Sequence, residues 1–146
     1  MAAINLTTIK TDFKRLNASN SNTLNALIGL QYTAIGKDFI QAELPVDQRT
    51  HQPYGRLHGG ASMVLIESLG SVASYLLVAD QGMVAVGIEI NANHIRPVRH
   101  GYVIGTAKPL HVGRTTHVWQ VQIHDQKQRL VCSGRMTTAI IPAAQG

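Results

Sequence analysis

The chain has 146 residues, 45% of them hydrophobic and 14% charged, which excludes an intrinsically disordered chain and suits one globular domain. Its formal net charge of +5 favours an anionic partner. The single cysteine, Cys132, excludes an intrachain disulfide and a cysteine-rich metal site, so we expect a reducing, cytoplasmic location.

The first 30 residues are expected to form an N-terminal extension that is partly helical. They lack the continuous apolar run of a signal peptide. Residues 22–28, closed by Gly29, predict a short capped helix. Since no linker or internal repeat follows, we treat residues 1–146 as a single domain.

A β-hairpin is predicted next. Residues 32–35 and 39–44 alternate between apolar and polar side chains around a turn at 36–38. Residues 45–57 contain two prolines and are expected to form a loop.

The segment 61–79 is apolar and almost long enough to span a bilayer. However, it carries Glu67 at its centre, together with four serines and Gly70. A central acid costs about 2.5–3.5 kcal/mol on insertion scales. We therefore interpret this segment as a buried helix of a soluble protein, which begins at residues 58–60.

Four strands are expected after this helix. Their alternating patterns cover residues 84–90, 102–110, 118–124 and 130–141. Consecutive strands joined by short turns are antiparallel, and a helix of about 20 residues is about 30 Å long, enough to lie along a whole sheet. The predicted fold is therefore α+β, with an antiparallel sheet wrapped around one long helix, the hotdog architecture. One such layer leaves apolar surface uncovered, so we also expect oligomerisation.

Glu67 is the candidate catalytic residue on the long helix. Its stripe of the helix carries small residues and no other charged side chain, whereas the opposite stripe is apolar. The stripe of Glu67 comprises Gly60, Ser71 and Ser74, and the opposite stripe comprises Leu65, Leu69, Val72 and Leu76. A carboxylate near a close-packed interface is costly unless it is used or paired. The alternative is an ordinary solvent-exposed glutamate.

The start of the helix is a second candidate feature. Gly59 and Gly60 follow His58, and unpaired N–H groups at a helix N-terminus suit a thioester carbonyl and its developing oxyanion. The alternative is a tight turn without further role. Gly59 and Glu67 are about two helical turns, or roughly 12 Å, apart, so one carbonyl cannot touch both groups of a single chain. A two-fold dimer would bring Glu67 of one chain to Gly59 of the other.

These residues resemble the active-site segments of PaaI-type hotdog acyl-CoA thioesterases. The resemblance spans roughly residues 30–141 and is carried by the segments 52–74, 86–101, 108–123 and 132–140. It is closest to the bacterial 1,4-dihydroxy-2-naphthoyl-CoA hydrolase subgroup, which includes the thioesterase that clears misacylated carrier protein in enterobactin synthesis. It implies that active sites lie across the interface of a homodimer or of a dimer of dimers (a homotetramer).

The resemblance implies five catalytic residues. Glu67 corresponds to the catalytic carboxylate, which acts as nucleophile or as general base on water. Gly59 corresponds to the oxyanion N–H donor, Gln52 and His58 to residues around the thioester and the water, and Ser71 to a hydroxyl that positions that water or the intermediate.

The resemblance also implies contacts to coenzyme A, which is part of the substrate rather than a cofactor. The implied pantetheine and nucleotide contacts are Gly87, His94, Ile95, Arg96 and Pro97. A turn near the phosphates comprises His111, Val112, Gly113, Arg114, Thr115 and Thr116. Arg96 and Arg114 suit phosphate oxygens, and Gly113 is expected to expose backbone N–H groups.

The implied substrate is an acyl-CoA, foremost an aroyl-CoA such as 1,4-dihydroxy-2-naphthoyl-CoA or a benzoyl-type ester. Two alternatives stay open, namely an acyl-carrier-protein proofreading thioesterase and a non-catalytic acyl-CoA sensor on the same fold. A hotdog dehydratase fits the flanking segments less well. The seven histidines show no metal-ligand spacing, and the basic residues lack clustered aromatics, so we expect no metal, nucleic-acid or membrane partner.

Overall fold

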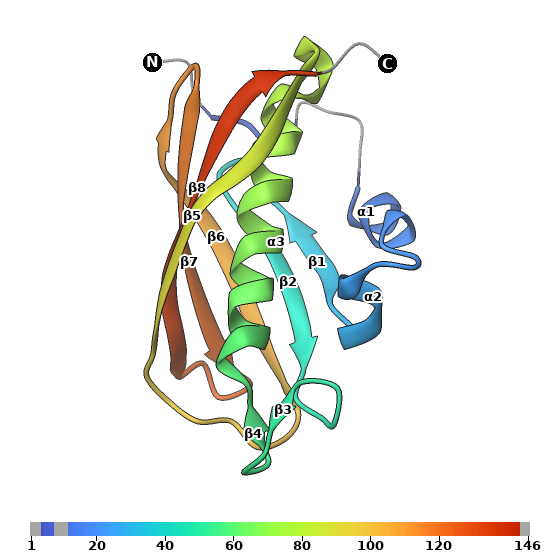
Figure 1. The fold of residues 1–146 in the computed structure, drawn as a ribbon, viewed down its shortest axis with the longest axis vertical. Coiled ribbons are helices and arrows are strands. Elements are labelled where there is room, and N and C mark those ends of the chain that lie inside the picture. Colours follow the sequence, from blue (N-terminus) through green and yellow to red (C-terminus); the bar gives the residue numbers. More distant parts are fainter. Residues whose placement is uncertain (1–3, 8–11, 144–146) are drawn as a thin grey trace.

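The computed structural model describes residues 4–7 and 12–143. One antiparallel sheet wraps around one long helix (Figure 1), which confirms the predicted α+β hotdog fold. The helix is α3, Gly59–Val78. The strands of the sheet, in their spatial order, are β1 (Gln31–Ile35), β2 (Ile40–Pro45), β6 (Tyr102–Val112), β7 (Thr116–Asp125), β8 (Leu130–Pro142) and β5 (Met83–His94).

The order of the strands differs from their order in the sequence at one place. β5 pairs with β8 at one edge of the sheet, whereas β6 pairs with β2 in its interior. The segment 95–101 therefore crosses from one edge of the sheet to the middle. It is fixed at both sides, because Ile95 donates to the Val131 carbonyl and the Gly101 carbonyl accepts from Val46.

The hairpin of β1 and β2 and the four later strands lie where the alternation predicts them. The predicted loop at 45–57, however, contains a second small hairpin, formed by β3 (His51–Gln52) and β4 (Arg56–Leu57). Strands of two residues are too short for an alternating pattern, so the sequence carries no periodic signal for them.

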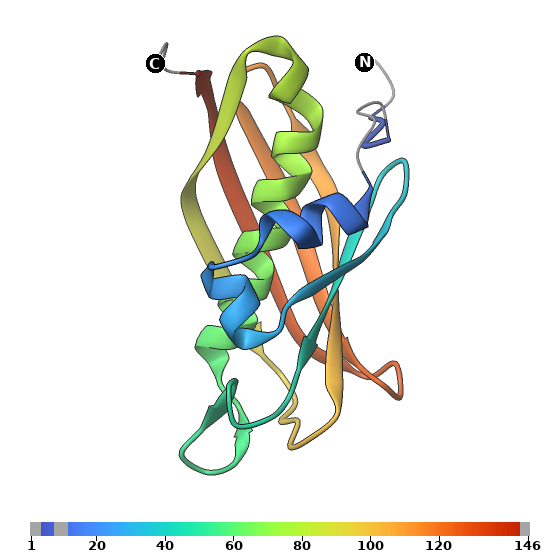
Figure 2. The same ribbon diagram turned by 90° about the vertical axis from the view of Figure 1, so that its right-hand side faces the viewer.

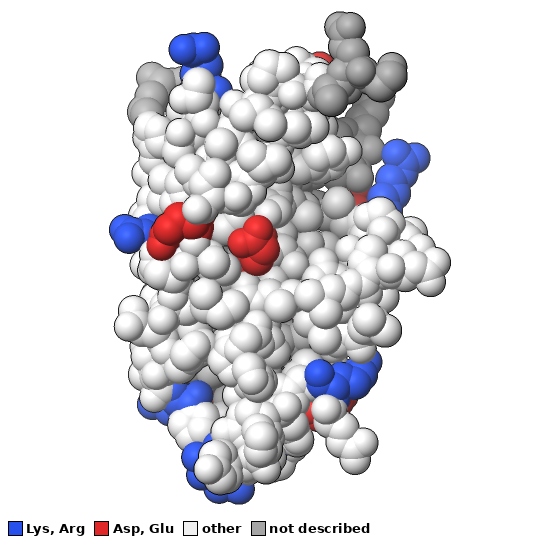
Figure 3. Space-filling model, in the orientation of Figure 1, with Lys and Arg blue, Asp and Glu red and all other residues white. Residues whose placement is uncertain are grey.

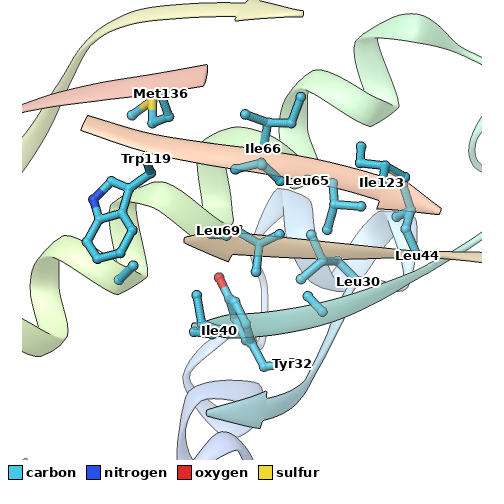
Figure 4. Packing of buried hydrophobic residues seen from close by; sticks show 14 of the residues in the cluster. Leu30, Tyr32, Ile40, Leu44, Leu65, Ile66, Leu69, Trp119, Ile123 and Met136 are labelled. Carbon is cyan, nitrogen blue, oxygen red and sulfur yellow. The ribbon is translucent and has the colours of Figure 1, made fainter. Parts of the chain in front are cut away.

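The apolar stripe of α3 packs into the concave side of the sheet (Figure 4). Leu65, Leu69 and Leu76 are fully buried there, as predicted. Ser74 is also fully buried, although the helical periodicity places it on the same stripe of the helix as Glu67. Its hydroxyl accepts from Trp119 Nε1 at 2.8 Å and pairs with Thr138 Oγ1 at 2.8 Å, so the curved sheet covers more of the helix than a flat one would.

The N-terminal region packs onto the same core. The helix α1 (Phe13–Ser19) and the short helix α2 (Leu24–Ile28) lie beside β1 and α3 (Figure 2). Asn17 bonds to both backbone groups of Tyr32, at 2.9 and 2.7 Å. As predicted, α2 ends at Gly29, whose φ of 77° is left-handed.

α3 with the turn that follows is long and apolar enough to cross a membrane by length and composition. The core helix of a soluble protein passes the same test. Its buried leucines contact the sheet, which is the packing expected of such a core helix.

Candidate active site

The first turn of α3 is capped by His58. The Gly60 N–H donates to His58 Nδ1 at 2.8 Å, so Nδ1 is the acceptor and the neutral ring carries its proton on Nε2. His58 itself is fixed by its own N–H, which donates to the Thr50 carbonyl. His58 therefore orients the helix start, in addition to the role that the resemblance implies.

Gly59 is the first residue of the helix and stands directly against His94. A Cβ at residue 59 would lie 2.8 Å from His94 Nε2, so glycine allows this close approach without a shift of the exposed His94 ring. Within the described part of the chain, the Gly59 N–H donates to no protein acceptor. It is a free donor at the positive end of a helix of 20 residues.

Gly59 also lines a pocket of about 320 Å³. One wall is the β3–β4 hairpin, the other is the segment after β5, and the floor is the start of α3. The lining residues are Gln52, Arg56, Leu57, Gly59, Ser62, His94, Ile95, Arg96, Pro97 and Val131. We call this the N-terminal pocket. Six of these residues were predicted as site residues, so the structure brings the predicted oxyanion donor and one of the two predicted CoA segments together.

Arg56, Leu57, Ser62 and Val131 complete the pocket without having been predicted. The sequence offers a signal only for Arg56, a basic side chain shortly before the two glycines. Gln52 lies opposite Arg56 in the small hairpin, and its side-chain oxygen accepts from the Tyr54 N–H. The Gln52 amide nitrogen is consequently the polar group that is left for a ligand.

Glu67 lies two turns further along α3, outside the lining of this pocket. The Ser71 hydroxyl donates to Glu67 Oε1 at 3.4 Å, as expected for residues four apart on a helix. On the other side stands Gly87 of β5, where a Cβ would lie 2.6 Å from Glu67 Oε1. The pairing of β5 with β8 shifts between Gly87 and Glu89, so a β-bulge lies beside the carboxylate.

The second predicted CoA segment lies at the opposite end of α3. The turn between β6 and β7 lines a separate pocket of about 950 Å³ with the last turn of the helix. The Gly113 N–H donates to the Thr116 carbonyl at 2.9 Å. The expectation that Gly113 exposes its N–H is therefore wrong, because that group closes the hairpin turn. Arg114 and Thr115 are exposed at the tip.

Basic side chains gather around the N-terminal pocket. The segments 46–58, 95–101 and 125–129 carry six Lys and Arg against two acids, whereas the rest of the chain carries seven against six. The three segments therefore carry +4 of the net charge of +5, and the rest of the chain carries +1. We call these three segments the basic end. Blue Lys and Arg side chains gather toward the lower end of the molecule in Figure 3.

Both acids of the basic end are held by arginines. The Arg129 side chain donates to Asp125 and lowers the pKa of that carboxyl to about 2. The Arg49 side chain does the same for Asp47, whose pKa is also about 2. The other cations of this end make no ion pair among the described residues, so their charge is available to an anion.

β5 forms an unpaired edge of the sheet beside Glu67. It is 12 residues long and exposes Val84, Val86 and Ile88, the last to 61%. Glu89 is the charged residue of this strand, whereas its residues 83–88 carry no charge, and apolar edges without a protecting charge favour pairing with another strand.

Residues 54–132 match the family described as the thioesterase superfamily. The chain is 50% identical over 132 residues to 1,4-dihydroxy-2-naphthoyl-CoA hydrolase of Escherichia coli strain K12, covering 90% of this chain and 96% of the relative. It is 48% identical over 126 residues to the proofreading thioesterase EntH of Klebsiella pneumoniae, covering 86% and 91%. A crystal structure of mutant thioesterase PA1618 from Pseudomonas aeruginosa has a TM-score of 0.90 at 45% identity, covering 92% and 97%.

Proposed function

The chain belongs to the thioesterase superfamily, and the relatives reported above are named as a CoA-ester hydrolase and as thioesterases; on this basis we propose that it hydrolyses an aroyl-CoA to the free acid and coenzyme A. A single observation carries this proposal. Gly59, whose N–H is free at the positive end of α3, lines a pocket whose other lining residues include two arginines and neither Asp nor Glu. Such a donor suits the oxygen of a thioester carbonyl. Water is the co-reactant, so the reaction needs no cofactor, and we expect it in the cytoplasm.

Glu67 acts on the carbonyl carbon by one of two routes. As nucleophile, its carboxylate forms a mixed anhydride, the C–S bond breaks and coenzyme A leaves as a thiolate. Water then cleaves the anhydride, which restores the Glu67 carboxylate and releases the acid, and a proton of that water passes to the thiolate. As general base, Glu67 takes a proton from the water that attacks the carbonyl, and that proton passes to the leaving thiol. Ser71 supports either route, because its hydroxyl reaches Glu67 Oε1.

We propose that the complete site forms between two copies of the chain. Glu67 lies outside the pocket of its own chain and faces the β5 edge through Gly87. Antiparallel pairing of two β5 strands would cover the exposed Val86 and Ile88 and place the two helices in opposite directions. Glu67 of each copy would then approach Gly59 of the other. The turn at residues 111–116 would approach the other copy's segment at 94–97 by the same symmetry.

The test is hydrolysis of benzoyl-CoA, followed by the release of free thiol. We expect Glu67→Gln to lower kcat by about 10³-fold or more, since it retains the shape of the side chain but loses its charge and basicity. Glu43→Gln, on β2, is the matched control and should be unaffected. Equal rates for Glu67→Gln and the wild type would refute the catalytic assignment, and no hydrolysis of benzoyl-CoA or of its hydroxy derivatives by the wild type would favour a sensor.

A single turnover in H₂¹⁸O tests for the mixed anhydride. Label in the Glu67 carboxylate identifies direct attack, because water then attacked the anhydride at that carbon. General-base catalysis and attack of water at the acyl carbon of the anhydride both place the label in the released acid only. Mass spectrometry of the peptide that contains Glu67 is the readout.

A further inference from the structure

Arg56 is the lining residue of the N-terminal pocket that has a buried side-chain nitrogen without a hydrogen-bond partner among the described residues. This nitrogen is Nε of the guanidinium. A buried donor without an acceptor costs about 1–3 kcal/mol, and more when it is charged. Asp47 and Asp125, the acids of the basic end, are already bound by Arg49 and Arg129.

The position of Arg56 indicates which part of a substrate it faces. The pocket has two walls, and the segment 94–97 is the wall that we assign to coenzyme A. Arg56 stands on the other wall, the β3–β4 hairpin, next to Leu57 and opposite Gln52. We consider a thioester whose carbonyl lies at Gly59 and whose thiol arm runs along residues 94–97. The acyl group of this thioester then extends toward Arg56.

We infer that Arg56 determines specificity by donating a hydrogen bond to an oxygen on the acyl group. The inference rests on the proposed function and narrows its substrate to acyl groups that carry a hydroxyl or carboxylate near the thioester. The Gln52 amide, whose oxygen is occupied by Tyr54, supplies a second donor on the same wall. A site with donors in place rejects an analogue that lacks the acceptor, because those donors are then left unpaired.

The test compares benzoyl-CoA with its 2-, 3- and 4-hydroxy derivatives. The quantity measured is the ratio of kcat/KM for each hydroxy ester to that for benzoyl-CoA. We expect a ratio of about ten or more for at least one isomer in the wild type, and a ratio near one in Arg56→Leu. Arg56→Lys, which keeps the charge but loses Nε, should restore only part of the preference.

Arg99→Leu is the matched control, since Arg99 belongs to the basic end but does not line this pocket. It should leave the ratio unchanged. A wild-type ratio near one for every isomer would overturn the inference. An equal loss of kcat/KM on all esters in Arg56→Leu would also overturn it, because Arg56 would then contact the pantetheine arm that all the esters share. Neither result touches the proposed function, which fails only if the wild type hydrolyses none of the esters. The melting temperature of each variant shows whether it is folded.

Discussion

The two ends of α3 differ in charge, in shape and in the way their loops are held. At the N-terminal end, Gly59 with its free N–H lines a pocket of about 320 Å³ among basic segments that bond to one another. At the C-terminal end, the larger pocket of about 950 Å³ has mostly apolar walls, with His111 and Arg114 at its edge. The helix dipole reinforces the positive charge of the first end and opposes that of the second.

This difference indicates that the two ends of α3 suit different parts of a substrate. The N-terminal end is suited to hold a polarised carbonyl, because its donors are fixed by the His58 cap and by the loops around it. The C-terminal end offers one exposed arginine at a hairpin tip, which suits a contact with a flexible anionic group. Glu67 lies between the ends, and neither pocket of its own chain includes it.

Among changes at the two ends of α3, the larger effect is expected at the helix start. In Gly59→Ala, the new Cβ would lie 2.8 Å from Nε2 of the exposed His94 ring, so either that ring or the first turn of α3 has to shift, and the geometry around the oxyanion donor changes. Loss of one oxyanion donor costs about 10²–10³ in kcat, and we expect a fall of about 10²-fold with little change in KM. Steady-state kinetics on benzoyl-CoA provide the measurement. If activity survived this substitution, the N-terminal end would not hold the carbonyl.

A smaller effect is expected at the other end of the helix. Arg114→Ala removes a contact worth about 1.5–3 kcal/mol if that side chain binds a phosphate, so KM for a CoA ester should rise about tenfold. The turnover number should stay within about twofold. Arg135→Ala, which removes an exposed arginine from β8, is the control. A loss confined to kcat would contradict a role in phosphate binding.

The surplus charge of the basic end predicts a weaker, salt-dependent effect. Lys127→Gln should lower kcat/KM for a CoA ester about two- to threefold at low ionic strength, because the charge attracts an anionic substrate over a distance. The effect should vanish at about 0.5 M salt. Lys37→Gln, which removes an exposed lysine from the β1–β2 turn, should have none. Equal effects of the two changes would show that only the total charge matters.

The smallest effect concerns stability. Hydrogen bonds from Arg129 lower the pKa of Asp125 in the fold to about 2, below its ordinary value of 3.8. The charged form therefore favours folding, so this contribution is complete well above pH 3.8 and is lost as the pH falls through about 2. Asp125→Asn should lower the melting temperature at neutral pH, and the difference from the wild type should shrink with acidification. Asp38→Asn is an exposed control. A difference that stays constant with pH would point to packing instead.

The sequence predicted those parts of the molecule whose signal is local. The alternation over residues 84–90 predicts β5, and the uncharged stripe around Glu67 predicts an unusual face of α3. It did not predict the pairing of β5 with β8, because that pairing joins segments about 50 residues apart. The same limit explains two site features. One is the hydrogen bond from the Gly113 N–H to Thr116, and the other is the pocket that Arg56 lines together with Arg96. Both features depend on chain reversals, which leave no periodic pattern in the sequence.

Trp119 gives the protein a built-in optical probe. It is the only tryptophan of the chain, it is fully buried, and its indole N–H bonds to Ser74 of α3. Any separation of the helix from β7 would expose this ring to water and break that bond. The red shift of its fluorescence emission therefore follows the contact between helix and sheet alone, free of overlap from a second indole. Loss of catalysis in a variant with an unchanged emission maximum can be attributed to the site rather than to the fold.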